Sequence, residues 1–168
     1  MKTILYVLIF SFASSLAADY VLNSPADNIQ VQVRLAEKIY YSVLFKGERV
    51  MQFSPLTLNV DGNTLGANAE VQNAESRQVD ESIDTVWGRR SDIRDFYNEL
   101  TLQCRGDFSV EFRAYNNGVA YRFVTDLKKK TVKVMHEEVA FRFDFGVSAW
   151  MLDGQSYETN YIYRPLDV

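Results

Sequence analysis

A regular alternation of apolar and polar side chains organises the chain between Asp107 and Phe123. In its first half, up to Tyr115, every second residue is apolar, which is typical of a strand with one buried face and one polar face. The turn residues Asn116, Asn117 and Gly118 follow, and they tolerate the positive φ angles that tight hairpin turns use. Because the alternation then resumes, the sequence predicts an antiparallel β-hairpin.

The pattern also predicts which side chains face each other across this hairpin. If the last two turn residues form the loop, Phe112 lies opposite Phe123 on the apolar face, and Arg113 lies opposite Arg122 on the polar face. Two like charges opposed across a hairpin are mildly destabilising. We therefore expect a carboxylate or a partner surface close to the two arginines.

Similar alternations recur along most of the chain. They predict strands at residues 29–35, 39–45, 49–53, 56–60, 93–104 and 139–145, with Pro55 separating two of them. Residues 64–80 are less regular and favour one irregular strand at 70–79, with a second candidate at 79–86. After the first twenty residues no segment has a sustained helical period, and there is no internal repeat. Many short strands at hairpin spacing predict an all-β fold, an antiparallel β-sandwich.

The pattern changes after Gly146. The remaining residues carry several aromatic side chains without a clean strand period, among them Trp150, Tyr157 and Tyr161. Aromatic rings in an irregular segment could form a rim that faces a sugar or another partner, or they could pack against a further domain. Both interpretations make these three residues candidate substrate-facing or partner-facing positions.

The beginning of the chain has the features of a secretory signal peptide. Lys2 gives a short basic start, residues 4–12 are apolar, and small residues lead to Ala17 and Ala18. This apolar run is too short for a convincing membrane span. We expect cleavage after residue 17 or 18, a periplasmic or secreted protein without a membrane span, and a mature chain of about 150 residues, which suits one domain. The predicted sandwich covers residues 19–150.

Composition excludes several classes of function. The net charge is −4 and the only cationic run is Lys128 to Lys130, so a nucleic-acid partner is not expected. Cys104 is the sole cysteine, and its position on the apolar side of a strand predicts a buried, unreactive thiol. His136 is the sole histidine, which excludes a zinc site rich in histidines and leaves a Ser-His-Asp triad only around that residue.

The acidic residues do not suggest a catalytic pair of one general acid and one base or nucleophile. Neighbouring carboxylates on one strand point to opposite faces, as at Glu137 with Glu138 and at Asp80 with Glu81. A third group is interleaved with arginines, which favours a surface rich in salt bridges or an interdomain contact; it contains Asp92, Asp95 and Glu99. We therefore expect no catalytic residue in this chain.

Two motifs carry a resemblance to a known family: YNNGVAYRF at 115–123 and GRRSDIRDFYNEL at 88–100. Together they resemble the N-terminal domain of glycoside hydrolase family 97, which contains bacterial α-glucosidases and α-galactosidases. The resemblance covers nearly all of the chain after residue 20, but only the first domain of a family enzyme. It implies a β-sandwich of the galactose-mutarotase-like type, also called a super-sandwich. In a full-length enzyme a catalytic (β/α)₈ barrel and a small C-terminal β domain would follow.

The resemblance also implies partners and a metal. Family enzymes depend on Ca²⁺ and act on α-linked oligosaccharides or α-galactosides, and a glutamate of the N-terminal domain joins barrel glutamates around the ion. By position, Glu158 matches that ligand. Because Ca²⁺ takes six to eight oxygen ligands, the isolated chain is not expected to bind it usefully, and calcium matters only in a full-length enzyme. The segment 151–168 would lead toward the absent catalytic domain.

Three functions remain open at this point. The chain could form one wall of the sugar pocket in a family 97 α-glycosidase, brace the barrel, lend a calcium ligand and be inactive alone. It could instead be a stand-alone carbohydrate-binding module that uses the aromatic residues after position 146. Finally, it could be a truncated, non-catalytic protein with an exposed apolar and arginine-rich face. The apparent lack of partners for Arg113 and Arg122 in the sequence pattern favours this third interpretation over a stand-alone module.

Overall fold

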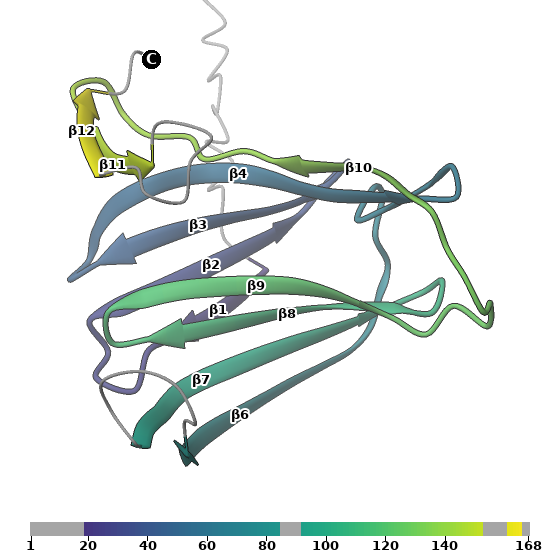
Figure 1. Cartoon of the computed structure of the whole chain (residues 1–168), viewed down its shortest axis with the longest axis horizontal. Coiled ribbons are helices and arrows are strands. Elements are labelled where there is room, and N and C mark those ends of the chain that lie inside the picture. Colours follow the sequence, from purple (N-terminus) through teal and green to yellow (C-terminus); the bar gives the residue numbers. More distant parts are fainter. Residues whose placement is uncertain (1–18, 85–91, 153–160, 166–168) are drawn as a thin grey trace, which may run out of the picture.

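The computed structural model describes residues 19–84, 92–152 and 161–165, with side chains up to residue 148. All regular structure in these ranges is β-strand, and no helix there is long and apolar enough to cross a membrane. Figure 1 shows two antiparallel layers lying face to face, with a short hairpin near the C-terminal end. The predicted antiparallel β-sandwich is confirmed.

The first sheet has the strand order β1-β2-β3-β4-β10, and β5 pairs with β4 as well. Its strands are β1 (Tyr20–Asn23), β2 (Ile29–Leu35), β3 (Ile39–Phe45), β4 (Glu48–Val60), β5 (Asn63–Leu65) and β10 (Val134–Val139). Tight turns join β3 to β4 and β4 to β5, each through a non-glycine residue and a glycine with positive φ, at 46–47 and at 61–62. The predicted strands at 29–35 and 39–45 are confirmed.

The second sheet has the order β6-β7-β8-β9. Its strands are β6 (Val71–Asp84), β7 (Asp92–Cys104), β8 (Phe108–Tyr115) and β9 (Gly118–Thr125). Strand β6 runs from Val71 to Asp84 without a break, so the described parts of the two candidate strands at 70–79 and 79–86 belong to one strand. Two further strands, β11 (Ser148–Leu152) and β12 (Tyr161–Pro165), pair with each other, although no strand period was evident there.

The core lies between the two sheets and consists of the inward residues of each strand. The first sheet contributes branched aliphatic side chains, and the second contributes the apolar face of the predicted hairpin. The largest fully buried apolar side chains are Phe112, Ile39, Leu56, Leu102, Val31, Val33 and Val110. Full burial of one such side chain contributes roughly 1.5–3 kcal/mol, so the face-to-face contact of the sheets dominates the stability of the fold.

The central hairpin forms, but its predicted register is wrong by two residues. Tyr115 pairs with Gly118, so Asn116 and Asn117 form the loop, and none of these turn residues is among those with positive φ. Phe112 consequently faces Tyr121. A shift of two residues keeps every side chain on its original face, so the apolar alternation alone does not distinguish the two registers.

Pro55 does not separate two strands. Strand β4 runs through it for 13 residues, and Pro55 lies opposite Tyr40 of β3. Proline removes a backbone N–H donor, which a regular ladder in mid-sheet would need. The register between β3 and β4 shifts close to this position, between Tyr41 and Val43.

The predicted strand at 139–145 is also wrong. Strand β10 ends at Val139, and beyond it only an isolated bridge joins Arg142 to Gln52 of β4. Phe143 packs partly against the core, whereas Phe141 and Phe145 are 58% and 91% exposed. The alternation is regular, but the described segment forms no continuous ladder with β4, and of its three phenylalanines only Phe143 is partly buried.

Candidate functional site

The outer face of the second sheet carries a row of charged side chains across three strands. Strand β8 directs its apolar residues into the core, so the residues between them point outward. The observed registers place Arg77 of β6, Glu99 of β7 and Arg113 of β8 side by side. We call these three residues the arginine–glutamate row.

Glu99 is the centre of this row and is 2% exposed, although it lies on the outer face. Its two carboxylate oxygens accept separate hydrogen bonds, one from Arg77 Nε at 2.6 Å and one from Arg113 Nε at 2.8 Å. A carboxylate removed from water is stable only when it is paired and hydrogen-bonded. The two arginines therefore cover Glu99 and also neutralise it.

This arrangement keeps Glu99 ionised. Burial alone would raise the pKa of its carboxyl, but the hydrogen bonds and positive charges of Arg77 and Arg113 outweigh burial, so the pKa lies below its ordinary value. A general acid for glycoside hydrolysis needs a raised pKa instead. Glu99 therefore acts as the ionised member of structural ion pairs. A proton donor at neutral pH would need surroundings that raise its pKa.

Two tyrosines extend the row toward one end of the sheet. The Arg113 guanidinium carbon lies 4.3 Å from the centroid of the Tyr97 ring, and the rings of Tyr97 and Tyr115 have centroids 5.0 Å apart. Tyr97 is buried and Tyr115 is half-buried. The guanidinium of Arg113 is therefore held both by a carboxylate and by an aromatic face.

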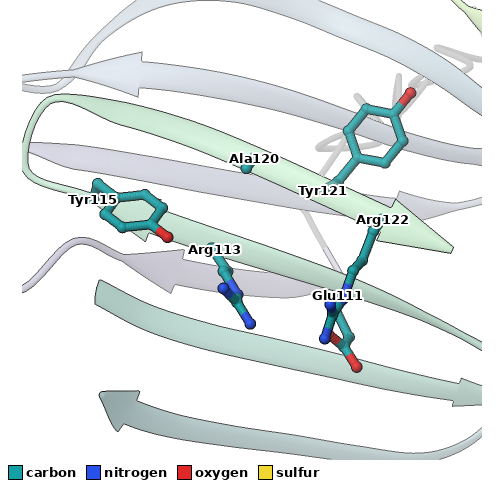
Figure 2. Close-up of a pocket in the computed structure, with 6 residues that line it drawn as sticks. All are labelled: Glu111, Arg113, Tyr115, Ala120, Tyr121 and Arg122. Atoms are coloured by element: carbon teal, nitrogen blue, oxygen red, sulfur yellow. The ribbon is translucent and has the colours of Figure 1, made fainter. Parts of the chain in front are cut away.

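A shallow hollow lies beside Arg113, where strand β9 carries small side chains. Its volume is about 140 Å³, and it is lined by Glu111, Arg113, Tyr115, Ala120, Tyr121 and Arg122. Figure 2 shows Glu111, Arg113 and Arg122 directed to one side of the strands, whereas the Tyr121 ring points to the other side. Arg122 Nε donates to Glu111 Oε2 at 2.6 Å, so the second arginine of the hollow is paired as well.

These contacts correct one expectation and confirm another. Arg113 and Arg122 do not face each other, because Arg113 lies opposite Ala120 and Arg122 lies opposite Glu111. The carboxylate expected near each arginine is present, as Glu99 and as Glu111. The apparent lack of partners that favoured a truncated protein is therefore wrong. Of the acidic group expected to form a surface rich in salt bridges, Glu99 does form ion pairs, with Arg77 and Arg113, and Arg94 pairs with Asp80.

A second surface is apolar and follows the free edge of the first sheet. Strand β10 pairs with β4 on one side and ends the described sheet on the other. Figure 1 shows it as the outermost strand of this layer. Six exposed apolar side chains lie on this strand or within six residues of its ends, and we call them the apolar edge: Val132, Val134, Met135, Val139, Phe141 and Phe145.

The remaining predicted positions are only partly placed. Trp150 and Tyr161 lie on the paired strands β11 and β12, where the backbone is described and the side chains are not. Tyr157 and Glu158 lie outside the described residues, as do the predicted signal peptide at 1–18 and the arginine-rich loop at 87–91. The structure therefore does not test the aromatic rim or the calcium ligand.

Two single residues behave as expected. Cys104 is buried and free, and burial raises the pKa of its thiol to about 11, which suits an unreactive core residue. His136 is exposed on β10. The adjacent carboxylates beside it point to opposite faces, since Glu137 accepts from the Tyr121 hydroxyl and Glu138 accepts from Lys38 Nζ.

The described residues offer no obvious metal centre. Among them no group of three or more histidine, cysteine, aspartate or glutamate side chains lies close enough together to hold a metal ion. Most carboxylates with a lowered pKa are tied to a lysine or arginine, as in Asp80 with Arg94 and Glu138 with Lys38. These carboxylates are therefore held in the ionised form by their cationic partners.

Comparison with known proteins gives a consistent family match. The family model described as "Glycosyl-hydrolase 97 N-terminal" matches residues 22–168. The chain is 37% identical over 111 residues to the "Retaining alpha-galactosidase" of Bacteroides thetaiotaomicron, covering 66% of this chain and 17% of the relative. It is 32% identical over 111 residues to the "Probable retaining alpha-galactosidase" of Streptomyces bingchenggensis, covering 62% of this chain and 17% of the relative. The chain thus matches 17% of the length of each curated relative.

Solved structures share the fold. A β-arabinopyranosidase crystal structure aligns with a TM-score of 0.74 at 25% identity, covering 86% of this chain and 26% of that protein. A glycoside hydrolase family 97 enzyme from Pseudoalteromonas sp. strain K8, solved with panose, aligns with a TM-score of 0.71 at 21% identity, covering 87% of this chain and 24% of that protein. In both cases about three-quarters of the solved protein lies outside the match.

Proposed function

The chain belongs to the glycosyl-hydrolase 97 family through its N-terminal domain, and we propose that it serves as the accessory sandwich domain of an α-glycosidase. In this role it forms part of the sugar pocket and braces a catalytic (β/α)₈ barrel. The apolar edge is the single observation that carries this proposal, because exposed apolar side chains gathered along one edge strand are a candidate surface for contact with another domain.

The position of the apolar edge supports a contact with a further domain. Its aromatic members, Phe141 and Phe145, come directly before β11 and β12, in the segment where a family chain approaches its catalytic domain. Burial of apolar surface contributes about 25 cal/mol per Å². Two phenylalanine rings placed in an interface would therefore contribute several kcal/mol to bracing.

Calcium enters the proposal as a ligand shared with the rest of an enzyme. Ca²⁺ prefers carboxylate and carbonyl oxygens and takes six to eight of them. The described residues do not gather a metal-binding group, so this domain would lend one carboxylate, proposed as Glu158, and the other domain would supply the rest. The chain alone would then bind calcium weakly or not at all.

We further propose that the chain alone does not hydrolyse glycosides and that it works outside the cytoplasm after removal of residues 1–18. The first part is supported by Glu99, a buried carboxylate of the described outer face, whose pKa is lowered where an acid catalyst would need it raised. The names of the curated relatives favour α-galactosides as substrates of the whole enzyme, with other α-linked oligosaccharides as the broader class.

A chimeric enzyme tests the bracing role. In the Bacteroides thetaiotaomicron relative, this chain would replace the matched N-terminal segment, and α-galactosidase activity and melting temperature would be measured. The double substitution Phe141→Ser with Phe145→Ser should lower the melting temperature of the chimera. It should leave that of the isolated chain nearly unchanged, because both rings are already exposed there.

Val21→Ser is the matched control. Val21 is also exposed and apolar, but it lies on β1, the opposite edge strand of the first sheet, and its substitution should alter neither protein. If the double substitution leaves the chimera as stable as the unsubstituted chimera, the apolar edge does not contact the catalytic domain. The bracing proposal would then be wrong.

A further inference from the structure

The hollow on the outer face of the second sheet has one small residue, Ala120, as its floor and long side chains as its walls. The register of β8 with β9 places Ala120 beside Arg113. Its volume of about 140 Å³ is several times the roughly 10–15 Å³ that holds one water on the same measure, so the hollow has room for a small ring.

The polar groups around this floor are already fixed in the folded chain. Arg113 is held by Glu99 and by the face of Tyr97, and Arg122 is held by Glu111. A ligand that meets ordered side chains loses less free energy to their immobilisation on binding. The planar guanidinium groups offer donors in a set geometry, and the neighbouring carboxylate of Glu111 offers acceptors.

The arginines of the hollow are already engaged inside the chain. Arg122 is paired with Glu111, and Arg113 shares Glu99 with Arg77, so neither arginine lacks a carboxylate partner. A ring with vicinal hydroxyls can accept from a guanidinium and donate to a carboxylate at once. Its C–H face can pack on the half-buried Tyr115 ring.

We propose that this hollow binds one neutral sugar ring of an α-linked saccharide, as a subsite separate from the C-terminal aromatic residues. Arg113 and Glu111 bond ring hydroxyls, Tyr115 packs on the ring, and Ala120 forms the floor. The proposal rests on the proposed role in α-glycoside processing. The proposal places the contact with the sugar ring on the outer face of β8 and β9.

Nuclear magnetic resonance titration of the full chain with panose tests this assignment. Saturable shifts should cluster at backbone amides of residues 111–122, on both strands that line the hollow. Ala120→Met fills the floor and should weaken binding at least tenfold. Val124→Met is the matched control, because Val124 lies on the outer face of the same strand, is also exposed, and does not line the hollow.

Three results would overturn the subsite. These are the absence of saturable shifts, shifts confined to residues 148–165, and equal binding by the wild type and Ala120→Met. None of these results would contradict the accessory-domain role, because that role is tested by the activity and stability of the chimera. Conversely, an unstable chimera with panose binding in the hollow would reject bracing and keep the subsite.

Discussion

Replacement of Glu99 by glutamine removes the negative charge at the centre of the arginine–glutamate row without changing the size of the side chain. Glutamine keeps one oxygen that can accept a hydrogen bond from one arginine, but its amide group donates toward the other. Glu99→Gln therefore breaks one of the two hydrogen bonds, leaves the other with a neutral acceptor, and deprives both arginines of their carboxylate.

The magnitude follows from how exposed each arginine is. The Arg77 side chain is 63% exposed and recovers hydration easily, whereas the Arg113 side chain is 25% exposed and does not. A hydrogen bond to a charged group contributes about 1.5–3 kcal/mol. We expect Glu99→Gln to lower the free energy of unfolding by about 2 kcal/mol at pH 7. For a chain of this size the melting temperature should fall by about 4–8 °C.

The loss in free energy of unfolding caused by Glu99→Gln should also depend on pH, being largest near neutral pH. The folded-state pKa of Glu99 lies below the ordinary value of 4.5, so its charge stabilises the folded state fully above about pH 4.5. That contribution disappears as the pH falls through the lower, folded-state pKa, where the carboxyl becomes protonated in both states. The difference between wild type and Glu99→Gln should therefore shrink at acidic pH.

Urea unfolding of both proteins between pH 7 and pH 3, followed by circular dichroism, measures this difference. Asp80→Asn is the control, because it breaks the exposed pair with Arg94 and should have a much smaller effect, reduced by solvent screening. A loss from Glu99→Gln no larger than that from Asp80→Asn, or one independent of pH, would refute the electrostatic account of the row.

Two further predictions concern the backbone and the thiol. Gly66→Ala should destabilise the fold more than Gly62→Ala. Both positions have positive φ, which costs a residue with a Cβ roughly 1–2 kcal/mol, but only a Cβ at residue 66 would lie 2.7 Å from the Leu56 carbonyl oxygen. Equal urea midpoints for the two variants would contradict this prediction. Burial raises the pKa of the Cys104 thiol to about 11, so Cys104 should resist iodoacetamide at pH 8 in the folded chain and react once guanidinium unfolds the chain. Rapid labelling of the native protein would show instead that the thiol is accessible.

The sequence predicted the sandwich because each strand alternates with period two, and burial follows that alternation closely in β2 and β8. It did not predict the hairpin register, since a slip of two residues preserves both faces. What distinguishes the registers is packing between the sheets. The Tyr121 ring packs against Tyr41, 5.5 Å away between centroids, and against Phe112, 6.4 Å away, and Tyr41 belongs to the other sheet.

The arginine–glutamate row illustrates the same limit. Its members are 22 and 14 residues apart in sequence, and only the registers of three strands bring them together. Sequence reasoning recognised a surface rich in salt bridges but did not single out Glu99. The failed strand at 139–145 has a related cause: alternation shows which side of a segment is apolar, and it does not show whether another strand is present to cover that side.

The central claim, that this chain is the accessory domain of an α-glycosidase, is tested most directly by one activity measurement. Release of p-nitrophenol from the α-galactoside and the α-glucoside would be followed with the purified chain and with the chimera, each with and without Ca²⁺. The account predicts no release by the chain alone and calcium-dependent release by the chimera. Hydrolysis by the chain alone, or a folded chimera without activity, would contradict it.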